Sequence, residues 1–328
     1  MFDVSIGTPW MWVGFLVFVL AMLALDLGVF HKKSHAVSLK EAACWSAVWV
    51  TLALIFNLGV YVFFGPERAL EFGTGYLIEK SLSIDNIFVF VVIFSYFAVP
   101  NALQHRVLFW GILGALATRA LFIVIGGTLI AKFHWMIYVF GAVLLFTGVK
   151  LLLQREAKMD PGSNPVIRVF RRFFPIASGY DGERFFTREN GKRAATPLFL
   201  ALLAIEATDV IFAVDSIPAI FAITRDPFIV FTSNIFAILG LRSMYFLLAG
   251  VVDKFRYLRF GLAGVLIFVG AKMALVDVYK VPIAVSLAVI ALLLGGSIAV
   301  SLVADKRRRA RETRPELSKT ETTEGSRS

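Results

Sequence analysis

The hydrophobic pattern of this chain consists of long apolar runs separated by polar connections. Each run has about 20 residues, the length that an α-helix needs to cross the hydrocarbon core of a bilayer. The pattern therefore predicts an all-α fold, a polytopic membrane helix bundle with about nine spans. The predicted spans cover residues 10–30, 42–64, 76–97, 107–130, 135–153, 197–223, 228–250, 258–276 and 282–303.

Composition agrees with a membrane protein. Hydrophobic residues make up 58% of the chain and charged residues 17%, whereas a soluble domain carries about 25% charged residues. The first run lacks a preceding basic segment and a small-residue cleavage site, so we interpret it as a retained span. The only cysteine, Cys44, excludes a disulfide framework and a metal site built from several thiolates.

The basic residues predict the orientation of the spans. The connections fall into two alternating sets, of which one holds 24 Lys and Arg residues and the other four. Because basic connections stay in the cytoplasm, the N-terminus is predicted to lie outside and the C-terminus inside. The basic set comprises 31–41, 98–106, 154–196, 251–259 and the tail from 304; the sparse set comprises 1–9, 65–72, 131–134, 224–227 and 277–281. The net charge of +10 is then a topology signal that also attracts anionic lipid, and we expect no nucleic-acid partner.

Two segments of the chain, 80–153 and 204–275, match when written one above the other. The match pairs Asp85 with Asp209, Arg119 with Arg242, and Lys150 with Lys272. Each copy contains three predicted spans, so the second copy enters the membrane from the opposite side. Inverted repeats of this kind occur in many secondary transporters, whose substrate sites lie near the midplane, often on interrupted helices.

The repeat predicts the organisation of the chain. The predicted parts are 1–72 (two N-terminal spans), 73–153 (first repeat), 154–195 (a cytoplasmic basic loop), 196–278 (second, inverted repeat), 279–303 (last span) and 304–328 (a disordered basic tail). Within the loop, 167–174 mixes Arg with Phe, and both a membrane-surface helix and a plain linker remain open. Pro218 in the sixth span and the polar residues around Asp85 in the third indicate interrupted helices, although a simple packing kink is the alternative.

Ionisable groups inside the apolar runs are the candidates for a functional site. A charge at the bilayer centre costs at least about 2.5–3.5 kcal/mol on insertion scales. Six carboxylates lie in the runs, but only two arginines lie deep in them, and the lysines are nearer to span ends where they can reach the interface. The excess negative charge therefore calls for protons or metal ions. Buried salt bridges to the two arginines are the structural alternative.

The proposed site is rich in oxygen ligands. The predicted metal ligands are Asp85, Asp209, Asp215, Glu79, Glu206, Asp26 and Asn86, with Arg119 and Arg242 as structural counter-charges. Glu206 and Asp209 share a helix face, and Asp85 and Asp209 are expected to face each other across the repeat axis. Carboxylate and amide oxygens suit Mn²⁺, Mg²⁺ or Ca²⁺. The four histidines fall in connections and are expected to be solvated.

Four stretches resemble the TerC family of integral membrane proteins: 24–42, 79–90, 105–123 and 206–248. The resemblance implies a bacterial inner-membrane protein with a link to metal-ion homeostasis. Members of that family have been connected with tellurium resistance, alkaline response and manganese export, and the family is grouped with the LysE superfamily of exporters. The resemblance, not composition, favours Mn²⁺ and transport out of the cytoplasm.

The leading hypothesis is a divalent-cation exporter, not an enzyme, that exchanges Mn²⁺ for protons and holds no tightly bound cofactor. The expected partners are the ion, protons and membrane lipid; the sequence sets no oligomeric state. A lipid-phosphate enzyme is one alternative, against which the chain shows no Gly-rich phosphate loop, no HExxH and no nucleophile–His pair. A membrane-protein assembly factor linked to tellurium resistance is another, and it would depend on the loop 154–195.

Overall fold

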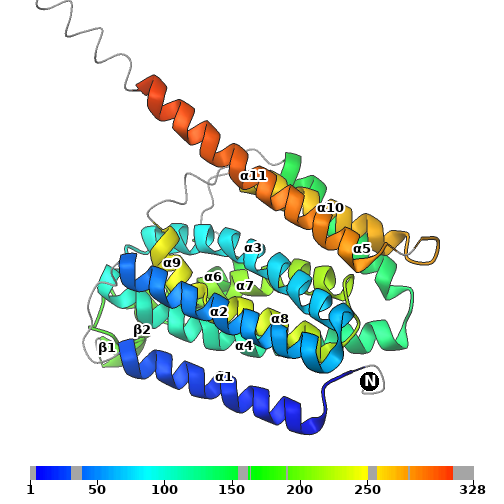
Figure 1. Ribbon diagram of the computed structural model, residues 1–328. Helices are drawn as coiled ribbons and strands as arrows, with labels where there is room; N and C mark the ends of the chain where they lie inside the picture. The colour runs from blue at the N-terminus through cyan, green and yellow to red at the C-terminus, as the bar shows by residue number, and fades with distance from the viewer. Residues whose placement is uncertain are drawn as a thin grey trace, which may run out of the picture.

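The computed structural model of the protein describes residues 5–30, 39–153, 162, 164–189, 191–249, 257–279 and 281–312. Within these residues the chain is built almost entirely of helices, with one short antiparallel hairpin (Figure 1). The elements are α1 (Pro9–Phe30), α2 (Leu39–Phe64), α3 (Pro66–Tyr96), α4 (Asn101–Lys132), α5 (Met136–Leu153), α6 (Pro165–Phe173), β1 (Phe186–Glu189), β2 (Lys192–Ala195), α7 (Pro197–Phe221), α8 (Pro227–Leu239), α9 (Leu241–Leu248), α10 (Leu258–Ala274) and α11 (Ile283–Glu312).

The long helices lie side by side in three groups (Figure 1). α5, α10 and α11 form one group, α1 lies at the opposite side, and the remaining long helices fill the space between them. The main contacts between the predicted halves join α4 to α7, α3 to α8, and α5 to α10. These are the pairings that a two-fold relation between the halves would produce, while the inverted repeat itself stays a prediction.

Small residues allow α5 and α10 to cross closely. A Cβ atom added to Gly270 would lie 2.8 Å from the carbonyl oxygen of Gly141, and one added to Gly141 would lie 3.0 Å from that of Gly270. Further along the same crossing, a Cβ atom on Gly148 would lie 3.0 Å from the Ala263 carbonyl oxygen. Glycine is therefore required where two membrane helices touch backbone to backbone.

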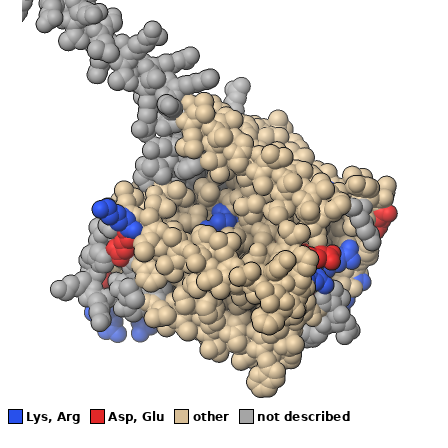
Figure 2. All heavy atoms as spheres, viewed as in Figure 1, with Lys and Arg blue, Asp and Glu red and all other residues tan. Residues whose placement is uncertain are grey.

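The helices identify a polytopic helical membrane protein. By length and composition, five of the described helices are suited to cross a membrane, and α8 with α9 makes a sixth if the pair counts as one bent span. On the face drawn in Figure 2, charged side chains gather toward the two ends and uncharged residues cover most of the middle. The count of nine spans stays a prediction, since α1, α3 and α10 do not meet the same criterion over their described residues.

The interruptions fall at a different place from the predicted one. α3 and α7 are continuous helices, and Pro218 lies in the last turn of α7, where an interrupted hydrogen-bond ladder affects few residues. The predicted seventh span, 228–250, is instead divided at Gly240 into α8 and α9, which are bent by 40°. Glycine is a poor helix former because it loses the most backbone entropy, so this break has an ordinary local cause.

The basic loop and the tail carry more structure than expected. The described part of the loop contains α6, whose first turn is capped by Asn164, and the hairpin, in which Phe186 pairs with Ala195. α11 continues to Glu312, so the prediction of disorder is wrong for 304–312. This stretch is rich in Arg and Lys, which are good helix formers and complement the negative end of the helix dipole.

Replacing Gly270 by Ala should destabilise the protein, because the new methyl group meets the Gly141 carbonyl. Overpacking of this kind costs about 1–3 kcal/mol. The matched control is Gly295→Ala on α11, where an added Cβ atom meets nothing within 4 Å and should stabilise the helix by about 0.5–1 kcal/mol. Thermal unfolding of both variants in detergent measures the difference; equal midpoints would show that the α5–α10 crossing is looser than described.

Candidate functional site

A buried arginine on α4 holds two carboxylates from different helices. Nη2 of Arg119 lies 3.2 Å from Oδ1 of Asp209 on α7, and Nε lies 3.5 Å from Oδ2 of the same residue. Nη1 of Arg119 donates a hydrogen bond to Glu79 on α3. All three residues are at most 3% exposed, so the ion pairs are shielded from solvent and from lipid.

Two neutral side chains complete the cluster around Arg119. Oγ of Ser216 and Oδ1 of Asn234 each accept a hydrogen bond of 3.3 Å from Nη1 of the arginine. Nδ2 of Asn234 also donates a hydrogen bond of 3.2 Å to Oε2 of Glu79. The cluster therefore draws on α3, α4, α7 and α8, and its hydrogen bonds tie these helices together. We call it the Arg119 cluster: Arg119, Glu79, Asp209, Ser216 and Asn234.

The Arg119 cluster holds more carboxyl groups than cations. If both carboxyl groups are ionised, the single guanidinium leaves one negative charge in a buried position. Burying a charge is costly unless it is paired and hydrogen-bonded, and the amide and hydroxyl groups here supply part of that compensation. The cluster can accept additional positive charge, either a proton or a cation.

The other predicted metal ligands lie outside the Arg119 cluster, or their side chains belong to the part of the molecule that is not described. Glu206 is half-buried and packs over α4, where a Cβ atom on Gly114 would overlap its carboxyl group. Asp215 is half-buried and accepts a hydrogen bond of 2.9 Å from Thr147 on α5. Asn86 is buried in α3. The side chains of Asp85 and Asp26 fall outside the described part of the molecule.

α7 is continuous from Asp209 to Asp215, so the interruption predicted near Pro218 does not change the relative positions of these two acids. Among the residues that the structure describes, no group of three or more His, Cys, Asp or Glu side chains is placed to hold a metal ion. Two predicted ligands, Glu79 and Asp209, do meet, with an arginine between them. The role of Arg119 as a structural counter-charge is consistent with these ion pairs and stays a prediction. The second predicted counter-charge, Arg242, is buried at the start of α9.

Asn234 is the member of the cluster that the sequence did not single out. It lies in the polar triplet Thr232–Ser233–Asn234 within an otherwise apolar run, and all three residues are fully buried. Three consecutive polar residues in a predicted span are a usable signal, because hydrogen-bonding groups in a membrane helix need partners. The triplet faces several helices at once, so the contact with Glu79 depends on how the bundle packs.

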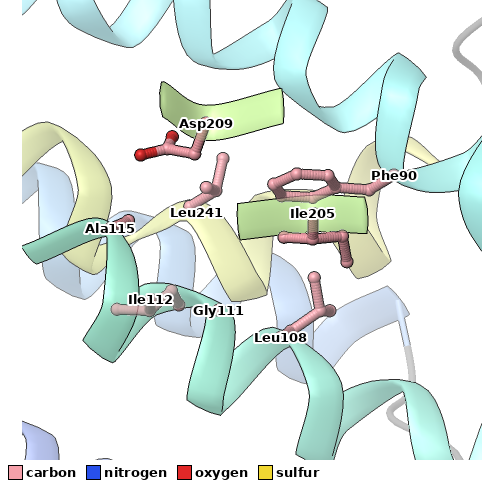
Figure 3. A pocket seen from close by; sticks show the side chains of 8 residues that line it. All are labelled: Phe90, Leu108, Gly111, Ile112, Ala115, Ile205, Asp209 and Leu241. Atoms are coloured by element: carbon pink, nitrogen blue, oxygen red, sulfur yellow. The ribbon is translucent and has the colours of Figure 1, made fainter. Parts of the chain in front are cut away.

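A small pocket of about 10 Å³ lies beside Asp209, large enough for about one water molecule. Asp209 is the only charged residue among those that line it. Figure 3 shows its carboxylate at one side of the pocket and the apolar side chains of Phe90, Ile205 and Leu108 at the other. We refer to this space as the small pocket.

Comparison with known proteins assigns the chain to a family. The sequence model described as "Integral membrane protein TerC family" matches residues 64–309. The chain belongs to the TerC family. The match covers every member of the Arg119 cluster, whereas α1 and nearly all of α2 precede it. No solved structure matches this TerC-family chain.

Relatives of this TerC-family chain are similar over nearly their whole length. An uncharacterized membrane protein of Myxococcus xanthus is 62% identical over 299 residues, which cover 91% of this chain and 94% of that protein. The "Putative membrane-bound redox modulator Alx" of Escherichia coli K12 is 53% identical over 295 residues, covering 87% and 92%. An uncharacterized membrane protein of Rickettsia bellii is 43% identical over 289 residues, covering 88% and 96%.

Removing the positive charge from the Arg119 cluster should destabilise the protein. Arg119→Met leaves two buried carboxylates without their cation, which costs about 3–5 kcal/mol. Combining it with Glu79→Gln and Asp209→Asn should recover much of the loss, because no buried charge then remains. The measurement is the thermal midpoint of each purified variant in detergent.

The control for this series is Arg184→Met. Arg184 lies on the surface of the hairpin region and pairs with Asp181 at 3.6 Å, and an exposed pair of this kind contributes little. An Arg119→Met protein as stable as Arg184→Met would show that the buried ion pairs do not hold the four helices together.

Proposed function

We propose that this TerC-family protein carries a divalent cation, Mn²⁺, out of the cytoplasm in exchange for protons. The observation that carries the proposal is the Arg119 cluster, in which two buried carboxylates share one arginine. Its members come from α3 and α4 of the first predicted repeat and from α7 and α8 of the second. Secondary transporters with inverted repeats bind their substrates at such a meeting place.

In this proposal Arg119 acts as a tethered cation. When no metal is bound, its guanidinium neutralises part of the charge on Glu79 and Asp209 through the hydrogen bonds that the structure shows. A dication entering between the two carboxylates replaces the arginine, while Ser216 and Asn234 offer neutral oxygens. Competition of two cations for the same carboxylates keeps the buried charge compensated in both states.

Further acids extend the proposed path along α7. Glu206 and Asp215 are half-buried at positions on either side of Asp209 along the helix, and each can take up a proton when a metal ion leaves. Asp85 is equivalent to Asp209 in the predicted repeat, and we propose that it provides a further ligand, with Asn86 as its neighbour. Inward movement of protons then drives outward movement of the metal.

The choice of ion combines chemistry with the family. Carboxylate, amide and hydroxyl oxygens are hard ligands that suit Mn²⁺, Mg²⁺ and Ca²⁺. The resemblance to a family connected with manganese export selects Mn²⁺ and the outward direction. The lipid-phosphate enzyme is less well supported, since the arginine that would hold a phosphate is already occupied by Glu79 and Asp209.

Several relatives are named as a putative membrane-bound redox modulator. A dithiol couple within one chain is excluded, because Cys44 on α2 is the only cysteine. Export of Mn²⁺, a redox-active metal, would connect that name with the proposed activity without a thiol site.

Asp209→Asn should abolish most of the transport while leaving the bundle folded. Loss of a charged ligand weakens ion binding by about 1.5–3 kcal/mol, at least about tenfold in affinity. The assay is proton-driven accumulation of Mn²⁺ in inside-out membrane vesicles, read with a metal-sensitive dye. The matched control is Asp277→Asn, an exposed acid that accepts a hydrogen bond from Tyr138 outside the Arg119 cluster.

Unchanged Mn²⁺ accumulation by Asp209→Asn would contradict the proposed site. The choice of ion is tested separately by measuring Mn, Mg, Ca and Zn in cells with and without the protein. The proposal expects Mn to rise in cells that lack the protein. A rise in Mg or Ca alone would show that the acidic cluster serves a different ion.

A further inference from the structure

A second and larger pocket lies at the end of the bundle where α3 begins. It has a volume of about 370 Å³ and is lined by residues from four parts of the chain. Glu71 comes from the first turns of α3, Ile223 and Thr224 from the turn between α7 and α8, Met273 from the end of α10, and Ile137 from the start of α5. We call it the outer pocket.

The outer pocket lies at the end that the charge bias places outside the cell. Its lining residues belong to, or lie within five residues of, the connections 65–72, 131–134, 224–227 and 277–281, all of which are in the set poor in Lys and Arg. The N-terminal segment reaches the same end: the backbone N–H of Ile6 donates a hydrogen bond of 2.7 Å to Asp226, which also caps α8. In Figure 1 this is the right-hand end, where the chain begins and the hairpin is absent.

A line of polar groups leads from the outer pocket to the Arg119 cluster. Glu71, Gly75 and Glu79 follow one another at intervals of four residues, so they share one face of α3. From Glu71 in the pocket to Glu79 in the cluster is about 12 Å along the helix. Between them, Gly75 faces the hydroxyl group of Ser233, since a Cβ atom there would lie 2.8 Å from Ser233 Oγ.

Polar side chains on α7 and α8 also lie along this line. On α8, Ser233 is followed by Asn234, which bonds to Glu79. On α7, Ser216 bonds to Arg119, and Phe221 near the end of the helix already lines the outer pocket. The seam between α3, α7 and α8 therefore carries the side-chain oxygens of Ser233, Asn234 and Ser216 next to Glu79 and Arg119, and it is closely packed where Ser233 meets Gly75.

The opposite side of the Arg119 cluster is apolar and closed. The small pocket beside Asp209 holds only about 10 Å³, and its other lining residues include Phe90, Leu108, Ile205 and Leu241. Along α4 and α7, Leu108 and Ile205 lie on the cytoplasmic side of Arg119 and Asp209. Ile205 also packs tightly on Gly111, where a Cβ atom would lie 3.1 Å from it. The small pocket is too small for a hydrated ion, and its lining offers no polar side chain other than Asp209.

We propose that the outer pocket is the extracytoplasmic mouth of the transport path, and that the apolar group Phe90, Leu108, Ile205 and Leu241 is its closed cytoplasmic gate. The exported dication leaves the Arg119 cluster along the seam of α3, α7 and α8 and passes Glu71. Glu71 is held at the mouth by Arg68, whose Nη1 donates a hydrogen bond of 2.9 Å to its carboxylate. This inference rests on the proposed function for the nature of the cargo and on the predicted orientation for the side of the membrane, while the asymmetry between the two ends rests on the volumes and linings of the two pockets.

Cysteine accessibility tests the path without a transport measurement. The starting protein carries Cys44→Ser, because Cys44 is the only native cysteine and is exposed. Single cysteines are then placed at Ile223 in the mouth, at Ser233 in the seam and at Leu108 in the gate. Val269, fully buried in α10, is the matched control. A membrane-impermeant thiol reagent is added to the outside of intact cells, and the rate of labelling is measured.

The proposal expects Ile223→Cys and Ser233→Cys to be labelled from outside at least about tenfold faster than Val269→Cys. Ile223 lines the outer pocket, and Ser233, although fully buried here, lies on the path that must open for the ion, whereas Val269 is buried away from that path and a thiol there reacts only after local unfolding. Leu108→Cys should react from outside no faster than Val269→Cys. Ile220→Cys, on the α7 wall of the seam beside Gly75, replaces Ser233→Cys if that variant does not fold. Equal rates at the seam and at Val269, or faster labelling at Leu108 than at Ser233, would overturn the inference.

The result separates this inference from the proposed function. If Ser233→Cys is labelled from outside while Asp209→Asn moves Mn²⁺ normally, the path is correct and the assignment of Asp209 as a ligand of the cargo is wrong. If Asp209→Asn abolishes transport while Ser233→Cys stays unlabelled, the site is correct and the mouth lies elsewhere, which overturns the present proposal. Labelling of Ile223→Cys only from the cytoplasmic side would also overturn it.

Discussion

The ion pairs between Arg119 and the carboxylates of Glu79 and Asp209 are the interaction on which the arrangement of this protein depends. A buried charge left without any partner costs several kcal/mol, so the arginine needs a carboxylate and each ionised carboxylate needs the arginine. α3, α4 and α7 must therefore come together in one register, and Asn234 adds α8 through its hydrogen bonds to the same groups. The apolar surfaces of the helices permit many packings, while the charged cluster selects one of them.

The same interaction links stability to the proposed transport. If the arginine neutralised all of the negative charge around it, no attraction would remain for a metal ion. If the site had no arginine, the negative charges of its carboxylates would be uncompensated whenever no ion was bound. One arginine for two carboxylates lies between these limits. In the proposed mechanism, the protein thereby keeps a folded, ion-free form whose remaining negative charge attracts a cation, and the polar side chains toward the outer pocket are the proposed route for that cation.

Much of the fold and part of the site could be predicted from the sequence. The long apolar runs correspond to helices, and Asp209 and Arg119 stand out because a charge within a membrane helix is costly whatever its partner. The position of the interruption was not predictable in the same way: Pro218 is accommodated near the end of α7, whereas the bend occurs at Gly240. Asn234 and the outer pocket depend on which faces of several helices meet, and a single sequence does not specify that.

The crossing of α5 and α10 has a mechanical consequence. Where Gly141 and Gly270 touch, main-chain atoms of the two helices meet with no side chains between them, so this contact has no flexible groups to take up movement. A rocking motion between the halves would have its pivot here, with the smallest displacement at the glycines. The ends of α3 and α7 that lie farthest from the glycines would then undergo the largest displacement.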